Sequence, residues 1–138
     1  MSVHKTILAI AACVACTTSA VADEGQLDRV HRKPILTEEV SPSVPLGKIR
    51  GASIAFKPGQ ETGRHMHPIP VVGYIVAGQV RFRIEGQPVR TLRAGDAFFE
   101  PANVVIAEFT NASRRKGATF VAFYLMHDGQ ERLIEAVR

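Results

Sequence analysis

Two histidines one residue apart, His65 and His67, are the side chains of this 138-residue chain whose type and spacing most directly suggest chemistry. Residues i and i+2 of a β-strand project from the same face, so both imidazoles would point the same way in an extended segment. They could then share one metal ion, and because imidazole binds iron, manganese, zinc, copper and nickel, the pair does not identify the ion. A mononuclear site normally has three or four protein ligands. The pair therefore predicts only part of a site, and two ordinary polar side chains at a strand end are the alternative.

The sequence around the pair is dominated by patterns typical of short β-strands. Residues 79–85 alternate strictly, with Val80, Phe82 and Ile84 on one face. The other predicted strands, bounded by turns rich in glycine and proline, are 49–56, 71–77, 89–93, 97–100, 104–109 and 119–126. No helical period occurs between these strands, and the C-terminal residues 131–137 fit either a short helix or an edge strand. The patterns predict one all-β domain, a sandwich or a barrel of antiparallel strands.

The N-terminal segment, residues 1–22, has the layout of a cleaved secretory signal. Lys5 precedes the apolar run 7–16, and residues 20–22, Ala-Val-Ala, offer a small-x-small cleavage site. The alternative is a membrane anchor, but the run is shorter than the roughly 20 residues of a spanning helix. We expect cleavage after Ala22 and a periplasmic or secreted protein, with no membrane span in the mature chain.

Composition argues against two further classes of function. Both cysteines lie in the predicted signal, so the mature chain would have no disulfide and no thiolate chemistry. The full chain has 17 basic and 13 acidic side chains, and removal of Lys5 with the signal leaves 16 against 13. This balance is too even to predict nucleic-acid binding. The one basic cluster, residues 114–116, is predicted to be a solvated turn.

Two segments resemble the two conserved motifs of the cupin superfamily: residues 58–80, PGQETGRHMHPIPVVGYIVAGQV, and residues 92–103, LRAGDAFFEPAN. The matching positions are Gly59, His65, His67 and Gly78 in the first motif, and Gly95 and Pro101 in the second. The chain is similar in particular to small secreted single-domain cupins with HPxPxxGYxxxG in the first motif. The resemblance implies a double-stranded β-helix, a jelly-roll barrel, over residues 47–126. An N-terminal arm (23–46) would precede it and a C-terminal tail (127–138) would follow.

The resemblance also implies that His65 and His67 match the first two cupin metal ligands, but the remaining ligand positions differ. Val71 stands at the glutamate position of the first motif, and Ile106 stands at the histidine position of the second. Neither side chain can bind a metal. Asn103 stands where the second motif has glycine. Half of the usual four-ligand set is therefore missing.

A displaced carboxylate could complete the set. Glu108 lies two residues beyond Ile106 and would share its face in a regular strand, and some similar cupins carry their second-motif ligand in this displaced place. Two histidines and one carboxylate would form a facial set that suits non-haem iron(II) or manganese. Open coordination positions would then receive a substrate or dioxygen. An exposed strand carboxylate is the alternative for Glu108, and Glu61 is a weaker reserve for the ligand.

Four further residues are candidates for the pocket around this site: Tyr74, Val71, Ile106 and Glu100. The hydroxyl of Tyr74 would orient a substrate from inside the barrel, or its ring would simply pack. Glu100 would line the mouth of the barrel or lie on the surface at a strand end.

The sequence leaves three functions open. The first is an exported metal-dependent oxidoreductase, similar to dioxygenases, that acts on a small molecule. The second is a non-catalytic barrel that binds a small-molecule ligand, since Val71 and Ile106 make the cavity apolar. The third is metal storage or sensing, which needs the ion but no substrate. The resemblance also leads us to expect a homodimer, paired through sheet edges.

Overall fold

The computed structural model describes residues 31–40 and 45–138. The chain divides into two compact units, residues 1–33 and 34–138. In the first unit only residues 31–33 are described, and they have no regular secondary structure. The predicted signal and its cleavage site lie outside the described residues. Every strand described below belongs to the second unit.

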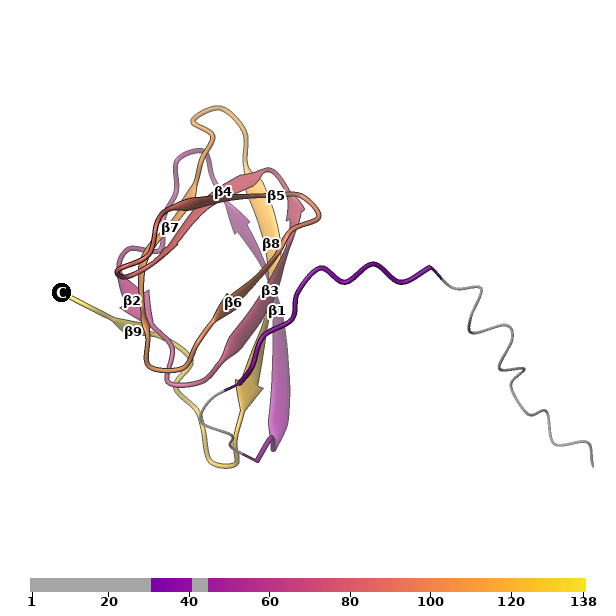
Figure 1. Cartoon of the computed structure of the whole chain (residues 1–138). Helices are drawn as coiled ribbons and strands as arrows, with labels where there is room; N and C mark the ends of the chain where they lie inside the picture. Colours follow the sequence, from indigo (N-terminus) through magenta and orange to yellow (C-terminus); the bar gives the residue numbers. More distant parts are fainter. Residues whose placement is uncertain (1–30, 41–44) are drawn as a thin grey trace, which may run out of the picture. The chain divides into compact units, whose positions relative to one another are not determined.

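From residue 48 onward the second unit consists of strands joined by turns and loops, and no helix occurs in the described part of the chain. The strands are β1 (Lys48–Phe56), β2 (His65–Met66), β3 (Val71–Ala77), β4 (Gln79–Ile84), β5 (Arg90–Arg93), β6 (Ala97–Glu100), β7 (Val105–Asn111), β8 (Ala118–Met126) and β9 (Glu135–Ala136). They form two sheets, in the orders β1-β8-β3-β6 and β5-β4-β7-β2-β9, with antiparallel pairing throughout (Figure 1). The predicted all-β jelly roll is confirmed. Within the described residues, no helix is both long and apolar enough to cross a membrane.

Aromatic side chains from both sheets meet in the core between them. Phe109 of β7 lies at its centre, with ring centroids 4.9 Å from Phe120, 5.1 Å from Phe98, 5.8 Å from Phe82 and 6.0 Å from Phe56. Each of these rings is at most 5% exposed. Burial of one such side chain stabilises the fold by roughly 1.5–3 kcal/mol. The alternation in the sequence is thus the pattern of side chains that point into this core.

Gly73 in β3 makes room for one of these rings. A Cβ atom at this position would lie 2.0 Å from Cζ of Phe98, on the strand paired with β3. Non-bonded carbon atoms do not approach so closely, so a larger residue at this position would displace the ring or the strand. The glycine explains how Phe98 reaches the core across an otherwise regular sheet.

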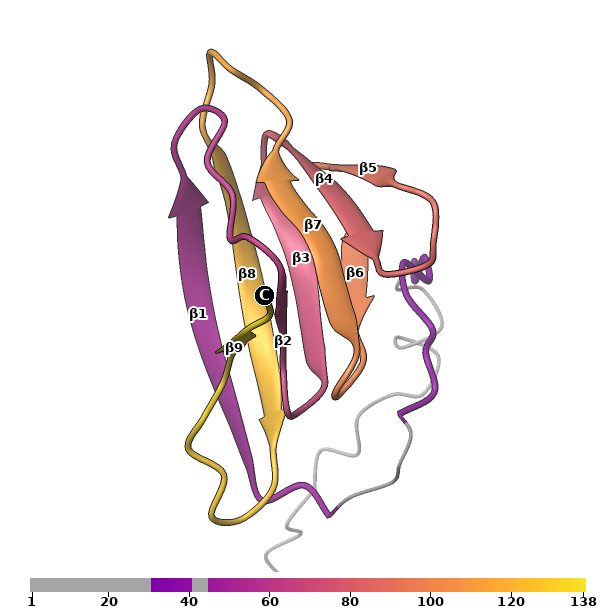
Figure 2. The same cartoon turned by 90° about the vertical axis from the view of Figure 1, so that its left-hand side faces the viewer.

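The second sheet ends in a strand from the C-terminal tail. β9 pairs with β2, and β2 pairs on its other side with β7 (Figure 2). Of the two alternatives for residues 131–137, the structure therefore has the edge strand. The two-residue strand β2 was not predicted, because its sequence is too short to show a period. It is nevertheless the segment that positions the histidine pair.

Candidate metal centre

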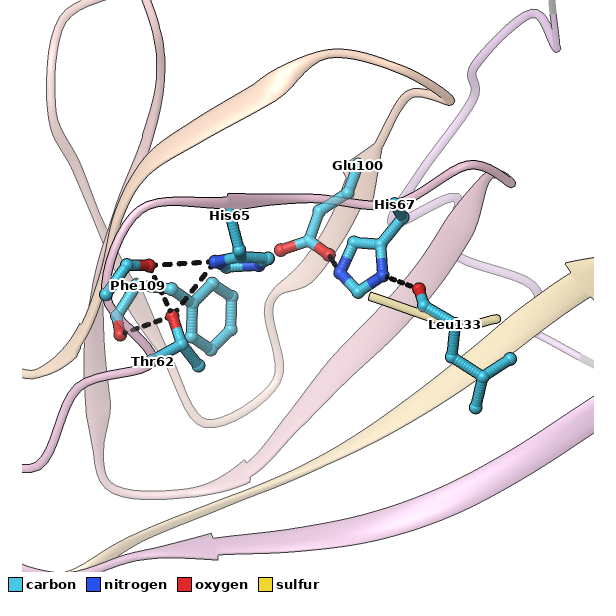
Figure 3. A network of polar contacts seen from close by, with 7 residues as sticks. Thr62, His65, His67, Glu100, Phe109 and Leu133 are labelled. Atoms are coloured by element: carbon cyan, nitrogen blue, oxygen red, sulfur yellow. Dashed lines mark hydrogen bonds and ion pairs between the residues drawn. The ribbon is translucent and has the colours of Figure 1, made fainter. Parts of the chain in front are cut away.

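His65 lies in β2 and His67 directly after it. Because β2 is held between β7 and β9, the segment is extended, and both imidazole rings point into the barrel (Figure 3). They are 3% and 4% exposed, whereas Met66 between them is only partly buried. The ring centroids lie 5.1 Å apart. The structure thus places the two rings on the same side of the segment, as strand parity requires.

A backbone carbonyl holds each ring through Nδ1. Nδ1 of His65 lies 2.9 Å from the carbonyl oxygen of Gly63 and 3.1 Å from Oγ1 of Thr62. Nδ1 of His67 hydrogen-bonds the carbonyl oxygen of Leu133, in the C-terminal tail (Figure 3). A carbonyl can only accept, so these partners assign the proton to Nδ1 and leave Nε2 for another ligand. Metal-binding histidines are typically oriented in this way, by a hydrogen bond from the ring nitrogen that does not face the metal.

Glu100, at the end of β6, is the third member of the cluster. Its Oε2 lies 2.9 Å from Nε2 of His67, and its side chain is almost fully buried. The carboxylate lies between the two imidazole rings (Figure 3). One ligand atom from each of His65, His67 and Glu100 falls within 4.8 Å of the others. Of the two roles considered for Glu100 from sequence, the structure has the inward one.

The electrostatics of the cluster favour a positive charge between its members. A buried carboxylate is costly unless a positive charge or hydrogen bonds compensate it. Burial lowers the pKa of His67, but the hydrogen bond and charge of Glu100, together with the Leu133 carbonyl, raise it above its usual value overall. Both nitrogens of His67 therefore face acceptors. A neutral imidazole has one N–H and can satisfy only one of them, so the contact between Nε2 and the Glu100 carboxyl group needs one additional proton or a metal ion.

Strand pairing explains how Glu100 reaches the site. Val71 occupies the glutamate position of the first motif and is paired with Glu100 across the β3–β6 ladder. Directly paired residues project from the same face of a sheet with their Cβ atoms about 4.5–5.5 Å apart. The carboxylate thus comes from the neighbouring strand, and Val71 itself is a buried apolar wall.

The structure places Glu108 outside this cluster, so the predicted repair through Glu108 is corrected. A register shift in the β4–β7 pairing sets Arg83 opposite Glu108 but Ile84 opposite Ile106. This bulge interrupts the alternation: Ile106 and Phe109 both point inward although they are three residues apart. The carboxylate of Glu108 falls on the outer face, with Oε1 2.6 Å from Nε of Arg81.

Ile106 itself is fully buried and paired with His65. It forms a second apolar wall beside the histidines, where the resemblance led to the expectation of a ligand. Glu61, the reserve candidate, is exposed and forms an isolated bridge with Thr110. It does not belong to the cluster of His65, His67 and Glu100.

The tyrosine inside the barrel is Tyr124, and Tyr74 lies on the outer face. Tyr74 is 40% exposed and lies three residues after the buried Val71, so parity places the two on opposite faces of β3. Tyr124 of β8 pairs with Val71, and its ring centroid lies 5.8 Å from that of His67. Burial, and then the charge of Glu100, raise the pKa of the Tyr124 hydroxyl. The predicted interior role of Tyr74 is wrong.

Asn103 fixes the backbone of His67 from the loop after β6. Its N–H donates to the carbonyl oxygen of His67 over 2.7 Å, and its φ is 59°. Glycine adopts this left-handed conformation freely, and asparagine is among the few other residues that tolerate it. This explains why asparagine can stand at the motif position of glycine.

The three inward groups fit a divalent metal ion. Two imidazole nitrogens and a carboxylate oxygen are donors that zinc, iron and manganese accept, typically at about 2.0–2.2 Å. Each ring is pre-oriented from Nδ1, and Glu100 supplies negative charge in a buried place. With three protein donors, coordination positions remain for water or another small molecule.

Sequence reasoning missed three groups that shape this site. Tyr124 could have been found by parity, because Phe120, Ala122 and Tyr124 share one face of the predicted strand 119–126. Thr62 and the carbonyl of Leu133 had no signal, since they support the histidines through contacts that depend on the tertiary fold.

A cavity of about 650 Å³ lies beside this centre. Its lining includes Ile69, Asn103 and Met126, and it does not include His65, His67 or Glu100. The candidate metal centre and this cavity are therefore separate features.

The family model described as "Cupin domain" matches residues 52–124, just over half of the chain. No curated protein matches the sequence.

Solved structures that resemble the fold include the following three. A cupin-like protein from Thermotoga maritima has a TM-score of 0.55 and 24% identity, with 64% of each chain covered. The DMSP lyase of Ruegeria pomeroyi has a TM-score of 0.54 and 20% identity, with coverage of 64% of this chain and 42% of that one. An oxalate oxidase has a TM-score of 0.55 and 22% identity, with coverage of 64% and 46%. This chain thus spans between 42% and 64% of the length of these structures, and at these identities the likeness concerns the fold.

Proposed function

Because this chain belongs to the cupin family, we propose that it binds one divalent metal ion through Nε2 of His65, Nε2 of His67 and the carboxylate of Glu100. The observation that carries this proposal is that Nε2 of His67 faces a buried carboxylate while its Nδ1 already donates to the Leu133 carbonyl. A cation between Nε2 and the carboxylate would interact favourably with the lone pair of the nitrogen and with the negative charge of Glu100 at the same time. The ion is one of iron, manganese, zinc, copper and nickel, which these donors do not distinguish.

We further propose that the site acts on a small molecule. A bound ion would supply Lewis acidity, and iron, manganese or copper would supply redox chemistry as well. The chain's own residues would shape the rest of the pocket: Val71 and Ile106 would exclude water, and Tyr124, whose ring lies beside that of His67, would orient a ligand. Two of the similar structures are named as enzymes, an oxalate oxidase and a DMSP lyase, which supports catalysis as the working hypothesis.

The test of metal binding is calorimetric titration of the mature, metal-free protein with each candidate ion. Wild type is expected to bind one ion per chain, and His67→Ala is expected to abolish binding. Glu61→Ala, which removes an exposed carboxylate outside the cluster, is the matched control and should bind as wild type does. Equal binding by wild type and His67→Ala would refute the site.

A non-catalytic small-molecule-binding barrel is the second candidate. The apolar cavity of about 650 Å³ supports it, since small-molecule pockets commonly measure about 300–1,000 Å³ and are mostly apolar. Thermal-shift measurements separate the candidates: metal salts should raise the melting temperature if the first is correct. Stabilisation by apolar ligands, with no response to metal salts, would favour the second.

Two expectations from sequence remain proposals. Residues 1–22 would direct export with cleavage after Ala22, which N-terminal sequencing of the exported protein tests directly. The chain would also form a homodimer, and the described surface offers a face for it: Ile49, Tyr74, Val76 and Phe123 are 40–56% exposed on the outside of the β1-β8-β3-β6 sheet. Exposed apolar faces of this kind commonly mark interfaces.

A further inference from the structure

The C-terminal tail, residues 127–138, contributes directly to the candidate metal centre. The Leu133 carbonyl accepts a hydrogen bond from Nδ1 of His67, and β9 pairs with the strand that carries His65 (Figures 2 and 3). The N–H of Val137 donates to the carbonyl oxygen of Arg64 over 3.0 Å. The tail therefore contacts the histidine segment at three consecutive points, before, at and after β2.

The histidine segment depends on these contacts because β2 is only two residues long. β7 holds one side of β2, and the tail holds the other. Without β9 the segment would become the edge of its sheet, and Nδ1 of His67 would lose its carbonyl partner. Outer partners of this kind fix the tautomer and ring orientation of a metal-binding histidine, and their loss typically weakens metal affinity about 10–100-fold.

The tail buries little apolar surface, so hydrophobic contacts contribute little to its attachment. Each of residues 127–138 is either exposed or only partly buried, and Ile134 is 49% exposed. Backbone hydrogen bonds to β2 and the bond to His67 thus make up a large part of its attachment. Segments with few buried contacts open at a small cost in free energy, so one additional or strengthened hydrogen bond shifts their equilibrium measurably.

We propose that docking of the C-terminal tail and binding of the metal ion at His67 are energetically coupled, with the Leu133 carbonyl acting as the positioning group. With an ion bound at Nε2, the proton of His67 would stay on Nδ1 and this N–H would be more polar, so that its hydrogen bond to Leu133 would be stronger and would hold the tail against β2. The docked tail in turn keeps the ring aimed at the ion. Coupling between two equilibria is reciprocal, so each event strengthens the other by the same factor. This inference rests on the metal site proposed above.

The first test uses the full mature chain with cobalt(II) as the probe ion. Amide hydrogen exchange of the peptide covering residues 133–138 should slow when cobalt is added. His67→Ala lacks the ring that would bind the ion through Nε2 and that bonds the tail through Nδ1. In this variant cobalt should leave the exchange of the tail unchanged. A tail with a purely structural role would exchange at the same rate with and without the ion.

The second test weakens the tail and measures the ion. Val137→Pro removes the N–H that donates to Arg64 and should reduce cobalt affinity about 10-fold or more, with a changed visible absorption spectrum of the bound ion. Arg138→Pro is the matched control, because its amide bonds no backbone carbonyl among the described residues. A chain that ends after Gln130 should show at least the loss seen for Val137→Pro.

The outcomes separate this inference from the proposed function. If wild type binds cobalt but Val137→Pro binds it equally well and tail exchange does not respond to the ion, the coupling is refuted and the metal site stands. If wild type binds no ion at all, both fail. Should the shortened chain not fold, hydrogen exchange in the intact protein still decides the question.

Discussion

Glu100 and Glu108 are the two carboxylates that distinguish the observed site from the site predicted by regular strand parity. Glu100 is buried beside His67, whereas Glu108 lies on the outer face beside Arg81. Loss of a group that hydrogen-bonds a metal-binding histidine typically weakens metal affinity roughly 10–100-fold. Glu100→Gln should weaken it by more than this, because the substitution removes the only negative charge of the cluster. Glu108→Gln removes the same charge on the other face and should leave affinity unchanged. Calorimetric titration compares the two, and the reverse ranking would restore Glu108 as the ligand.

The raised pKa of His67 predicts how the metal-free protein responds to pH. A group whose pKa is raised by folding stabilises the folded state fully below its unfolded pKa, about 6.5 for histidine, and this contribution is lost as pH rises through the folded value. The melting temperature of the metal-free protein should therefore fall over this window relative to that of His67→Gln. A bound ion replaces the proton at Nε2, so the metal-loaded protein should not show this loss. Identical pH profiles for wild type and His67→Gln, both without metal, would contradict the assignment.

At the residue scale, the sequence brought together the two histidines that are one residue apart, and it named Glu100 only as a candidate for the mouth of the barrel, not as a member of the same cluster. His65 and His67 share a face because of local parity, which a sequence displays. Glu100 reaches them through its pairing with Val71, and nothing local encodes that register. The hydrogen bond from His67 to Leu133 joins residues 66 positions apart and is equally invisible to local pattern.

At the element scale, most strands were predictable, and the errors arose where strands are irregular or very short. The alternation in residues 79–85 gave β4 directly, because its inward side chains are all apolar. The bulge in β7 reverses the parity between Ile106 and Glu108, and its sequence carries no glycine to mark it. β2 and β9 have two residues each and are defined by their neighbours rather than by a pattern.

The close packing of Gly73 against Phe98 leads to a prediction about the stability of the β1-β8-β3-β6 sheet. Gly73→Ala should lower the free energy of unfolding by about 1–3 kcal/mol, the usual cost of overpacking, because the new Cβ overlaps the buried ring of Phe98. Gly51→Ala is the matched control: its Cβ would lie 3.1 Å from the ring of Phe123, which is 43% exposed and free to move. Urea denaturation measures both, and a larger loss for Gly51→Ala would contradict this account of the core.

At the scale of the whole molecule, the two faces of the β1-β8-β3-β6 sheet carry different kinds of side chain. The inner face carries the core, Tyr124 and Glu100, while the outer face carries exposed apolar side chains and, within its four strands, no charged residue. The expectation from sequence was pairing through sheet edges; the exposed side chains favour pairing through this face.

The face leads to a prediction about assembly. Wild type should sediment as a dimer, and Phe123→Lys should sediment as a monomer, since a charge at the centre of an apolar interface is left without a partner. Ile134→Lys introduces the same charge at an exposed apolar residue in the tail and should remain dimeric. Analytical ultracentrifugation distinguishes the two variants. A wild-type monomer at all accessible concentrations would remove the face as an interface.

The measurement that tests the central claim most directly is elemental analysis of the mature protein, purified without an affinity tag, beside His65→Ala and His67→Ala. Two imidazoles and the Glu100 carboxylate should retain about one divalent ion per chain in the wild type. Loss of either imidazole should strip the ion while the barrel stays folded. A wild type free of iron, manganese, zinc, copper and nickel, or variants that keep the ion, would contradict the claim.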